Sequence, residues 1–369
     1  MAWSLSVSGP VLPLYVRSLG VEIMDWGFLA TAHSMGLILF DGFWGTVSDR
    51  VDRGRMVVAA LICMGIVFPF YTFKSLVPLF FILQFAVGAS VIAVGPITRA
   101  LIADFAPEES LGFYMSLWFT FSALGSMMGP LLGGYISEVF GFNYAFYTSS
   151  ILPLSSAAVL AVSLRNRLFV EKPTTEREWN ISMSLRKLLS VPVVRMIFFL
   201  AVAVYTSMSA IIFFLPIYAS ERVGMSTVAI GLLQTLASGT QLAVTPFLGR
   251  LSDRLSRRNM VSFGLATSAV LFPCYIAVAT PIQMTLLTVG IAACLSTASL
   301  ILTMLSKVVS RELSGMAMGI YGSFEDLGLI LGPLIYGLIW EVYSPSHIFL
   351  ASAVSLLIGL VFIARVKNK

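Results

Sequence analysis

Long stretches without a charged side chain are the feature that most limits how this chain can fold. No Asp, Glu, Lys or Arg occurs in residues 75–98, 110–137, 139–164, 196–220 and 223–249. Each run is longer than the roughly 20 residues with which a helix crosses about 30 Å of hydrocarbon. A further run, 259–306, is long enough for two spans, and Pro281 divides it. We therefore predict an all-α polytopic membrane protein.

The rest of the chain fits the same class, because 58% of its 369 residues are hydrophobic and only 11% are charged. The pattern predicts twelve helices, near 3–17, 26–48, 56–73, 77–103, 111–137, 143–164, 193–219, 227–249, 260–280, 283–306, 315–341 and 346–364. The first is too short to span and contains Pro10 and Pro13. Helix 1 is therefore either short or truncated at the start of this sequence.

The basic residues are distributed unequally between the two sides of the predicted membrane. When the loops are assigned to alternating sides, all 23 Lys and Arg lie on one side except Arg17, Lys74 and Arg222. Short loops rich in Lys and Arg stay in the cytoplasm. We expect a multi-pass protein of the plasma membrane with both termini cytoplasmic. The net charge of +5 then reflects topology and indicates no nucleic-acid partner.

Groups that carry enzyme chemistry are not apparent in the sequence. Cys63, Cys274 and Cys294 lie in apolar spans, and their spacing suits neither a metal site nor a disulfide framework. No nucleophile–base pair or ATP-binding phosphate loop is recognisable. We expect a protein that is not an enzyme and needs no metal or other cofactor.

Two charged segments interrupt the apolar pattern about two hundred residues apart. "GTVSDRVDRGR" occupies 45–55 and "GRLSDRLSRRN" occupies 249–259. A shift of 203 or 204 residues aligns them, with Asp49 opposite Asp253. The same register aligns "EESLGFYMS" (108–116) with "RELSGMAMG" (311–319), and "GSMMGPLLGG" (125–134) with "GLILGPLIYG" (328–337). The chain is therefore an internal repeat of two pseudo-symmetric six-helix halves.

The repeat defines the expected domains. Residues 1–164 form the N-terminal six-helix bundle and 193–369 the C-terminal one, joined by a basic cytoplasmic linker over 165–192. Paired halves of this kind are the plan of transporters that alternate access to a central site.

The charged segments resemble the loop motif of the major facilitator superfamily, roughly Gly-x-Leu-x-Asp-Arg-x-Gly-Arg-Arg, and the resemblance extends over essentially the whole chain. Asp52 and Ser256 replace the later glycine of the motif. The resemblance implies a gate: Asp49 caps the start of helix 11, and Asp104 joins the arginines. The alternative is a basic loop that only sets topology. The gating set is Gly45, Asp49, Arg50, Arg53, Arg55, Asp104, Gly249, Asp253, Arg254, Arg257 and Arg258.

Small residues in helices 5 and 11 predict faces where helices pack closely. The pattern Gly-x-x-x-Gly-Pro-x-x-Gly-Gly resembles the one found in drug:proton antiporters of the family, although Ser116 stands where a further glycine is expected. This resemblance favours an exporter. The alternative is that the pattern only allows close packing of helices. The residues are Gly125, Gly129, Pro130, Gly133, Gly134, Gly328, Gly332, Pro333 and Gly337.

Ionisable residues inside membrane helices are candidate coupling sites. Away from their ends, the predicted helices contain three acidic residues but only one Arg and one His. At least one carboxyl is therefore expected to lack a fixed cation. Adjacent helical residues point about 100° apart, so Glu325 and Asp326 cannot both face one cavity, and the spacing to Gly332 favours Asp326. Phe81 replaces the arginine that many family exporters carry in helix 4. The candidates are Asp326, Glu325, Asp41, His33 and Arg99.

The residues expected to line the substrate cavity are only modestly polar. In the family this cavity is lined by helices 1, 4, 7 and 10, and an apolar cavity with isolated acids suits amphipathic or cationic compounds. Core packing or lipid contact is the alternative role for the aromatic residues. The candidates are Gln84, Thr98, Trp118, Tyr205, Thr206, Ser296, Thr297 and Ser299.

Together these features predict a secondary active transporter that works by alternating access. We expect proton-coupled efflux of small amphipathic or drug-like compounds, with a small molecule, H+ and the lipid bilayer as partners and a monomeric carrier. The alternatives are a proton-coupled symporter that imports a metabolite and, in another class, a non-transporting membrane sensor.

Overall fold

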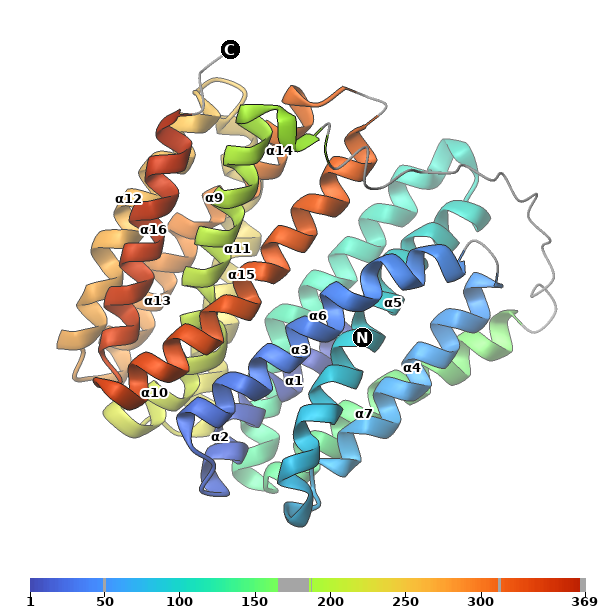
Figure 1. Ribbon diagram of the computed structural model, residues 1–369. Coiled ribbons are helices and arrows are strands. Elements are labelled where there is room, and N and C mark those ends of the chain that lie inside the picture. The colour runs from blue at the N-terminus through green and yellow to red at the C-terminus, as the bar shows by residue number, and fades with distance from the viewer. Residues whose placement is uncertain (49–50, 165–185, 187, 311–312, 366–369) are drawn as a thin grey trace. The chain divides into compact units, whose positions relative to one another are not determined.

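The computed structural model describes residues 1–48, 51–164, 186, 188–310 and 313–365, and the regular elements among them are all helical (Figure 1). Eleven helical segments in this part of the chain are long and apolar enough to cross a membrane. The predicted all-helical, polytopic fold is therefore confirmed.

The described residues of the N-terminal repeat form seven α-helices, of which the first two are short, and two 3-10 helices. Its elements are α1 (Ala2–Ser8), α2 (Val11–Ser18), α3 (Ile23–Ser48), α4 (Arg53–Phe70), η1 (Lys74–Leu79), α5 (Phe80–Phe105), η2 (Glu108–Ser110), α6 (Leu111–Val139) and α7 (Phe142–Leu164). The short first span expected from the sequence consists of α1 and α2. Pro10 separates them, because its missing N–H interrupts the helical hydrogen bonds.

The C-terminal repeat has the same order with more interruptions. Its elements are α9 (Pro192–Ser209), η3 (Ala210–Phe214), α10 (Leu215–Val223), α11 (Thr227–Leu251), α12 (Arg257–Leu271), η4 (Phe272–Ala277), α13 (Pro281–Leu295), η5 (Ser296–Ala298), α14 (Ser299–Val308), α15 (Ser314–Val342) and α16 (His347–Arg365). The single helices expected over 193–219 and 283–306 are each divided. In the first, η3 is a π-helical turn just before Pro216, which cannot continue the regular bonding pattern.

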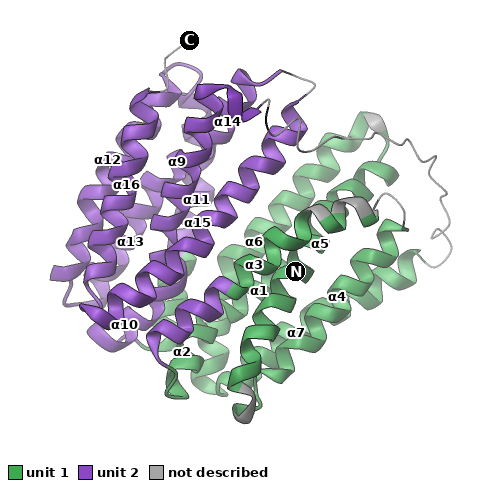
Figure 2. Cartoon of the chain, viewed as in Figure 1, with its two compact units in different colours: residues 1–21, 32–176, 226–235 green, residues 22–31, 177–225, 236–369 purple. Residues whose placement is uncertain are grey.

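The chain divides into two compact units (Figure 2). Unit 1 comprises Met1–Val21, Ala32–Glu176 and Ser226–Thr235, and unit 2 comprises Glu22–Thr31, Arg177–Met225 and Leu236–Lys369. Two helices are therefore shared: α3 begins in unit 2 and continues in unit 1, and α11 does the reverse. Most of the predicted linker, 165–192, lies outside the described residues.

Each unit has a helical core built on close packing. In unit 1, α4 packs against α5 and α7, and α1 packs against α6. A cluster of buried apolar residues from α4, α5 and α7 includes Met56, Leu61, Val94, Ile97 and Ala157. In unit 2, α9 packs against α15 and α16, and α12 packs against α16. These pairings hold the candidate site residues on rigid elements.

An aromatic cluster recurs at equivalent positions of the two units. Tyr15 meets Phe146 edge-on at a centroid distance of 5.1 Å, and Tyr71 stacks on the same ring at 5.5 Å. In unit 2, Phe349 meets Tyr218 edge-on at 4.8 Å and stacks with Tyr275 at 4.3 Å. The offset between the clusters is 203 or 204 residues, the same as in the sequence repeat.

Candidate functional site

The first charged segment joins the start of α4 to the end of α5. Arg53 Nη1 donates to both carboxylate oxygens of Asp104, at 3.1 and 2.9 Å. The two side chains are only 20% and 25% exposed, so solvent screens this ion pair less than a fully exposed one. The expected gating residues Asp49 and Arg50 lie outside the described residues, and Gly45 lies near the end of α3.

The residue that replaces the motif's later glycine forms a helix cap. Asp52 is the N-cap of α4, and its Oδ1 accepts a hydrogen bond of 2.7 Å from the backbone N–H of Arg55. Such a bond satisfies one of the amides left unpaired at the start of a helix. The turn is therefore stabilised by a side chain where the family motif has a flexible residue.

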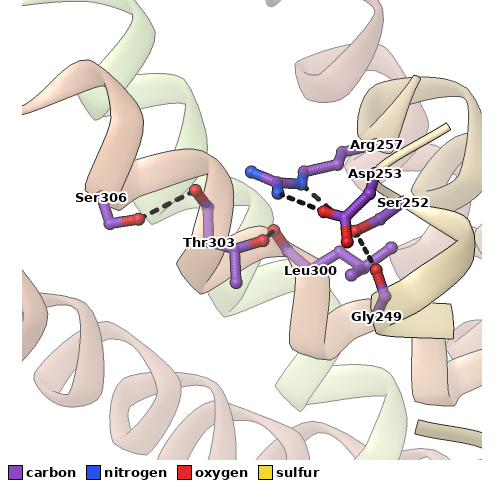
Figure 3. Close-up of polar contacts among 7 residues, drawn as sticks. All are labelled: Gly249, Ser252, Asp253, Arg257, Leu300, Thr303 and Ser306. Atoms are coloured by element: carbon purple, nitrogen blue, oxygen red, sulfur yellow. Dashed lines mark hydrogen bonds and ion pairs between the residues drawn. The ribbon is translucent and has the colours of Figure 1, made fainter. Parts of the chain in front are cut away.

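The second charged segment forms more local contacts (Figure 3). Ser252 Oγ donates to the carbonyl oxygen of Gly249 at 2.7 Å, and Arg257 Nε donates to Ser252 Oγ at 3.4 Å. Arg257 Nη2 also pairs with Asp253 Oδ1 at 3.6 Å, although Asp253 is 73% exposed. Arg254 is exposed as well. This segment is therefore held mainly by contacts within its own turn.

One arginine of the second segment reaches another helix. Arg258 Nη2 donates to the carbonyl oxygen of Ala364 at 2.6 Å, in the last turn of α16. The final carbonyls of a helix have no partner within it and carry partial negative charge, so an arginine is favoured there. The segment thereby ties the start of α12 to the end of α16.

The small residues of α6 pack against two helices, α1 and α11. A Cβ atom at Gly129 or Gly133 would collide with Ser6 or Val7 of α1, and one at Gly125 would overlap the Trp3 ring. Gly134 faces the start of α11 instead, where the carbonyl of Thr227 leaves no room for a side chain. Pro130 presents its carbonyl to Gly231 of α11.

The corresponding pattern of α15 is arranged in the same way. A Cβ atom at Gly328 would meet the Val202 carbonyl of α9 at 2.7 Å, and one at Gly332 would collide with Ser209. Gly337 and Pro333 face the first residues of α3, where Gly27 lies against the Pro333 carbonyl. In both repeats, glycines allow backbones to approach each other to a distance that a larger residue prevents.

The acids of α15 lie beside two tyrosines. The hydroxyl groups of Tyr205, from α9, and Tyr321, one turn earlier on α15, interact with the carboxyl of Glu325. Tyr205 also interacts electrostatically with Asp326. Close contact of Gly328 with Tyr205 brings α9 and α15 together here. Sequence reasoning did not identify Tyr321, although its spacing of four residues from Glu325 is the spacing of neighbours on a helix.

The candidates of α3 lie against α5. His33 interacts with the backbone of Gln84, which is 8% exposed, and the Trp44 indole donates to the Ala89 carbonyl at 2.8 Å. Gly36 and Gly88 permit this approach, because a Cβ atom on either would strike the other helix. Asp41, two turns beyond His33 on α3, is partly buried.

Arg99 and Trp118 were identified separately from the sequence, and the structure brings them together. The guanidinium carbon of Arg99, on α5, lies 5.5 Å from the centre of the Trp118 ring on α6. This is cation–π geometry. No local sequence spacing could have indicated the pair, because the two residues belong to different helices.

Most of the remaining polar candidates bond to nearby backbone. Thr206 Oγ1 donates to the Gly328 carbonyl across α9 and α15 at 3.3 Å. Three others, Ser296, Thr297 and Ser299, donate to carbonyls three or four residues earlier in their own segment. The Thr98 hydroxyl is buried with no hydrogen-bond partner among the described residues.

A helical bundle that spans the membrane repeatedly, with two related halves and acids inside its helices, is the structural class of secondary carriers. The Major Facilitator Superfamily model matches residues 1–231 and 197–369, so each repeat is covered. This chain belongs to the Major Facilitator Superfamily and is a membrane transporter.

Similar proteins agree with this assignment. The multidrug resistance protein MdtG of Escherichia coli (strain K12 / DH10B) is 26% identical over 97% of this chain and 90% of its own length. A bacterial homolog of the human lysosomal transporter Spinster shares the fold with a TM-score of 0.80 at 15% identity, covering 98% of this chain and 93% of that one. The D-xylose-proton symporter has a TM-score of 0.73 at 16% identity, covering 99% and 94%.

Proposed function

We propose that this transporter exports small amphipathic or cationic compounds in exchange for protons. The observation that carries the proposal is the similarity to MdtG, a multidrug resistance protein, over almost the whole of both chains. The Gly-Pro pattern of α6 and the modest polarity of the candidate cavity residues support the same direction and substrate class.

We place Glu325 ahead of Asp326, which the spacing favours, as the first candidate for the coupling carboxyl because of its surroundings. Its only partners among the described residues are the hydroxyl groups of Tyr205 and Tyr321, and no ion pair to a described Lys, Arg or His compensates its charge. A carboxyl without a fixed cation in the membrane can gain and lose a proton as water access alternates. Asp326 and Asp41 are the next candidates.

The two charged segments are the proposed gate of the carrier. The Arg53–Asp104 pair ties α4 to α5, and Arg258 ties α12 to α16. Each segment thereby joins neighbouring helices of its own unit. We propose that Asp49 adds the contact that breaks and re-forms during transport. We also propose that both segments face the cytoplasm of a plasma-membrane carrier that is monomeric and has no enzymatic step.

Transport by purified protein in liposomes tests this function. A pH step should drive movement of fluorescent amphipathic cations in the direction of export, and Glu325→Gln should reduce proton-driven flux at least tenfold. Counterflow exchange without a pH gradient should persist in that variant. Glu341→Gln, an exposed acid on the same helix, is the matched control and should retain wild-type flux. Accumulation in the opposite direction would indicate an importer.

A further inference from the structure

A carboxylate at the end of α6 is bonded to the start of α11. Glu138 Oε2 accepts hydrogen bonds from the backbone N–H of Val228 at 2.8 Å and from Thr227 Oγ1 at 3.1 Å. Thr227 is the first residue of α11, where the backbone amides have no partner within the helix. An acid is favoured here because it pairs with the amides and opposes the positive end of the helix dipole.

Further contacts extend from this bond along both helices. The Thr227 hydroxyl also lies 3.2 Å from the Gly134 carbonyl, and Thr235 Oγ1 accepts from the Leu131 N–H at 3.2 Å. Close packing of Gly134 and Gly231 against the opposite backbones makes these distances possible. The first part of α11 is therefore held to α6 along more than two turns.

The other repeat pairs the equivalent helices without the same bond. The repeat register aligns Glu138 with Glu341, and Thr227 with Ile23, which has no hydroxyl. Gly27 packs tightly, because a Cβ atom there would lie 2.6 Å from the Pro333 carbonyl oxygen. Gly337 is looser: a Cβ atom there would lie 3.4 Å from the Ile23 carbonyl oxygen, against 2.4 Å between Gly134 and the Thr227 carbonyl oxygen. Glu341, however, is exposed and has no hydrogen bond or ion pair to another described residue. The acid-to-helix bond is therefore specific to α6 and α11.

The bond lies in a helix that is shared between the two units, so it affects how the units can rearrange. Ser226–Thr235 belongs to unit 1, whereas the helix continues in unit 2 from Leu236 (Figure 2). Any rearrangement of one unit against the other must either carry the first turns of α11 along with α6 or release them. The bond to Glu138 opposes release.

We propose that Glu138 is a positioning residue for transport, which latches the start of α11 to α6 in this conformation and releases it in another. The latch requires no particular substrate or driving ion, only that the two units rearrange during transport. A latch of this kind sets the ratio of the two conformations, and its loss favours the released one.

Cysteine labelling tests the latch without a substrate or a proton gradient. Cys63, Cys274 and Cys294 are replaced by Ser, and Ile230→Cys, at a position on α11 that is 1% exposed, serves as the reporter. Glu138→Gln keeps an acceptor oxygen but removes the charge, and should raise the maleimide labelling rate about fivefold, the factor that corresponds to ~1 kcal/mol for a charge at a helix N-terminus. Thr227→Val should raise it less, and Glu341→Gln should leave it unchanged.

A second reporter separates release from unfolding. The second reporter is Ala157→Cys. Ala157 lies in the core cluster of unit 1, away from α11, and is 2% exposed. Its labelling should not change in Glu138→Gln, and Glu138→Asp should restore part of the protection of Ile230→Cys. An unchanged rate at Ile230→Cys would overturn the proposal. Equal increases at both reporters would also overturn it, because they would show a purely structural role.

Transport rates provide an independent readout. If the latch sets conformational ratios, Glu138→Gln should change maximal turnover severalfold while the KM for a fluorescent substrate changes less than twofold. A loss of folded protein would instead lower the amount of active carrier without altering turnover per folded molecule. Turnover per folded molecule equal to that of wild type would contradict the latch.

Discussion

The two charged segments occupy equivalent positions in the repeat, yet their arginines have different partners. Arg53 bonds to Asp104 at the end of α5. Its counterpart Arg257 turns back to Ser252 and the exposed Asp253. The register that aligns Glu109 with Glu312 places Lys307 opposite Asp104. A cation cannot accept the bond that Asp104 accepts, and the partners of Arg257 among the described residues are local.

The aromatic clusters show the same divergence in a buried setting. In unit 2, Tyr218 donates to the Tyr275 carbonyl at 3.1 Å, and Tyr275 shares a hydrogen bond of 2.8 Å with Thr288. The hydroxyls of Tyr15 and Tyr71 have no partner among the described residues. Ring packing is therefore common to the two halves, whereas polar bonding differs. Apolar packing depends on shape alone, but each hydrogen bond requires one particular partner.

The largest effect should come from the packing that the halves share. Gly129→Val and Gly332→Val each place atoms where Ser6 or Ser209 already lies, and each should destabilise the protein by about 3 kcal/mol. Thermal unfolding in detergent and the yield of monodisperse protein measure this effect. Gly322→Val, on the same helix as Gly332, meets nothing within 4 Å and is the matched control. Equal losses in all three variants would point to helix propensity instead of packing.

The charged segments should differ in a double-mutant cycle. Arg53→Ala and Asp104→Asn should be coupled by about 1–2 kcal/mol, because the pair is bonded through both carboxylate oxygens and is partly buried. Arg257→Ala and Asp253→Asn should be coupled by less than ~0.5 kcal/mol, as is usual for an exposed pair. Thermal stability of the four single and two double variants gives both values. Similar coupling energies in the two segments would show that the Arg53–Asp104 pair is no stronger than the Arg257–Asp253 pair.

The two aromatic clusters should respond differently to the loss of a tyrosine hydroxyl. Tyr275→Phe removes a buried hydrogen bond and leaves Thr288 without that partner, so it should cost about 1 kcal/mol. Tyr71→Phe removes a buried hydroxyl that has no partner among the described residues, and should be neutral or stabilising by up to ~1 kcal/mol. Unfolding temperatures of the two variants measure the difference. A comparable loss from Tyr71→Phe would show that its hydroxyl is bonded in the protein.

The smallest effect should come from restoring an acid in the second repeat. Lys307→Asp offers Arg257 the partner that Arg53 has, and should stabilise the protein by ~0.5 kcal/mol, as is usual for an exposed ion pair. Combining it with Arg257→Ala should abolish the gain, and Lys307→Asn controls for loss of the lysine. If the gain persists without Arg257, the difference between the segments lies in the backbone and not in the side chain at position 307.

Several site contacts illustrate how far sequence reasoning extends. The charge-free runs predict the spans, and the prolines predict the interrupted first helix. Family resemblance places Asp104 near the arginines. Neither Tyr321 nor Glu138 was identified, because a tyrosine and a helix-end acid are ordinary residues by sequence. Arg99 and Trp118 were named without being paired, because nothing local relates α5 to α6.

By itself, the sequence determined the membrane class, the positions of most helices, the repeat and the family. These depend on hydrophobicity and spacing along one helix, which are local properties. Only the tertiary structure decided which helix each glycine faces, which tyrosines adjoin Glu325, and that α3 and α11 are each shared between the units. Such contacts join residues far apart in the chain. They are set by how whole helices pack, and no short segment of sequence encodes that arrangement.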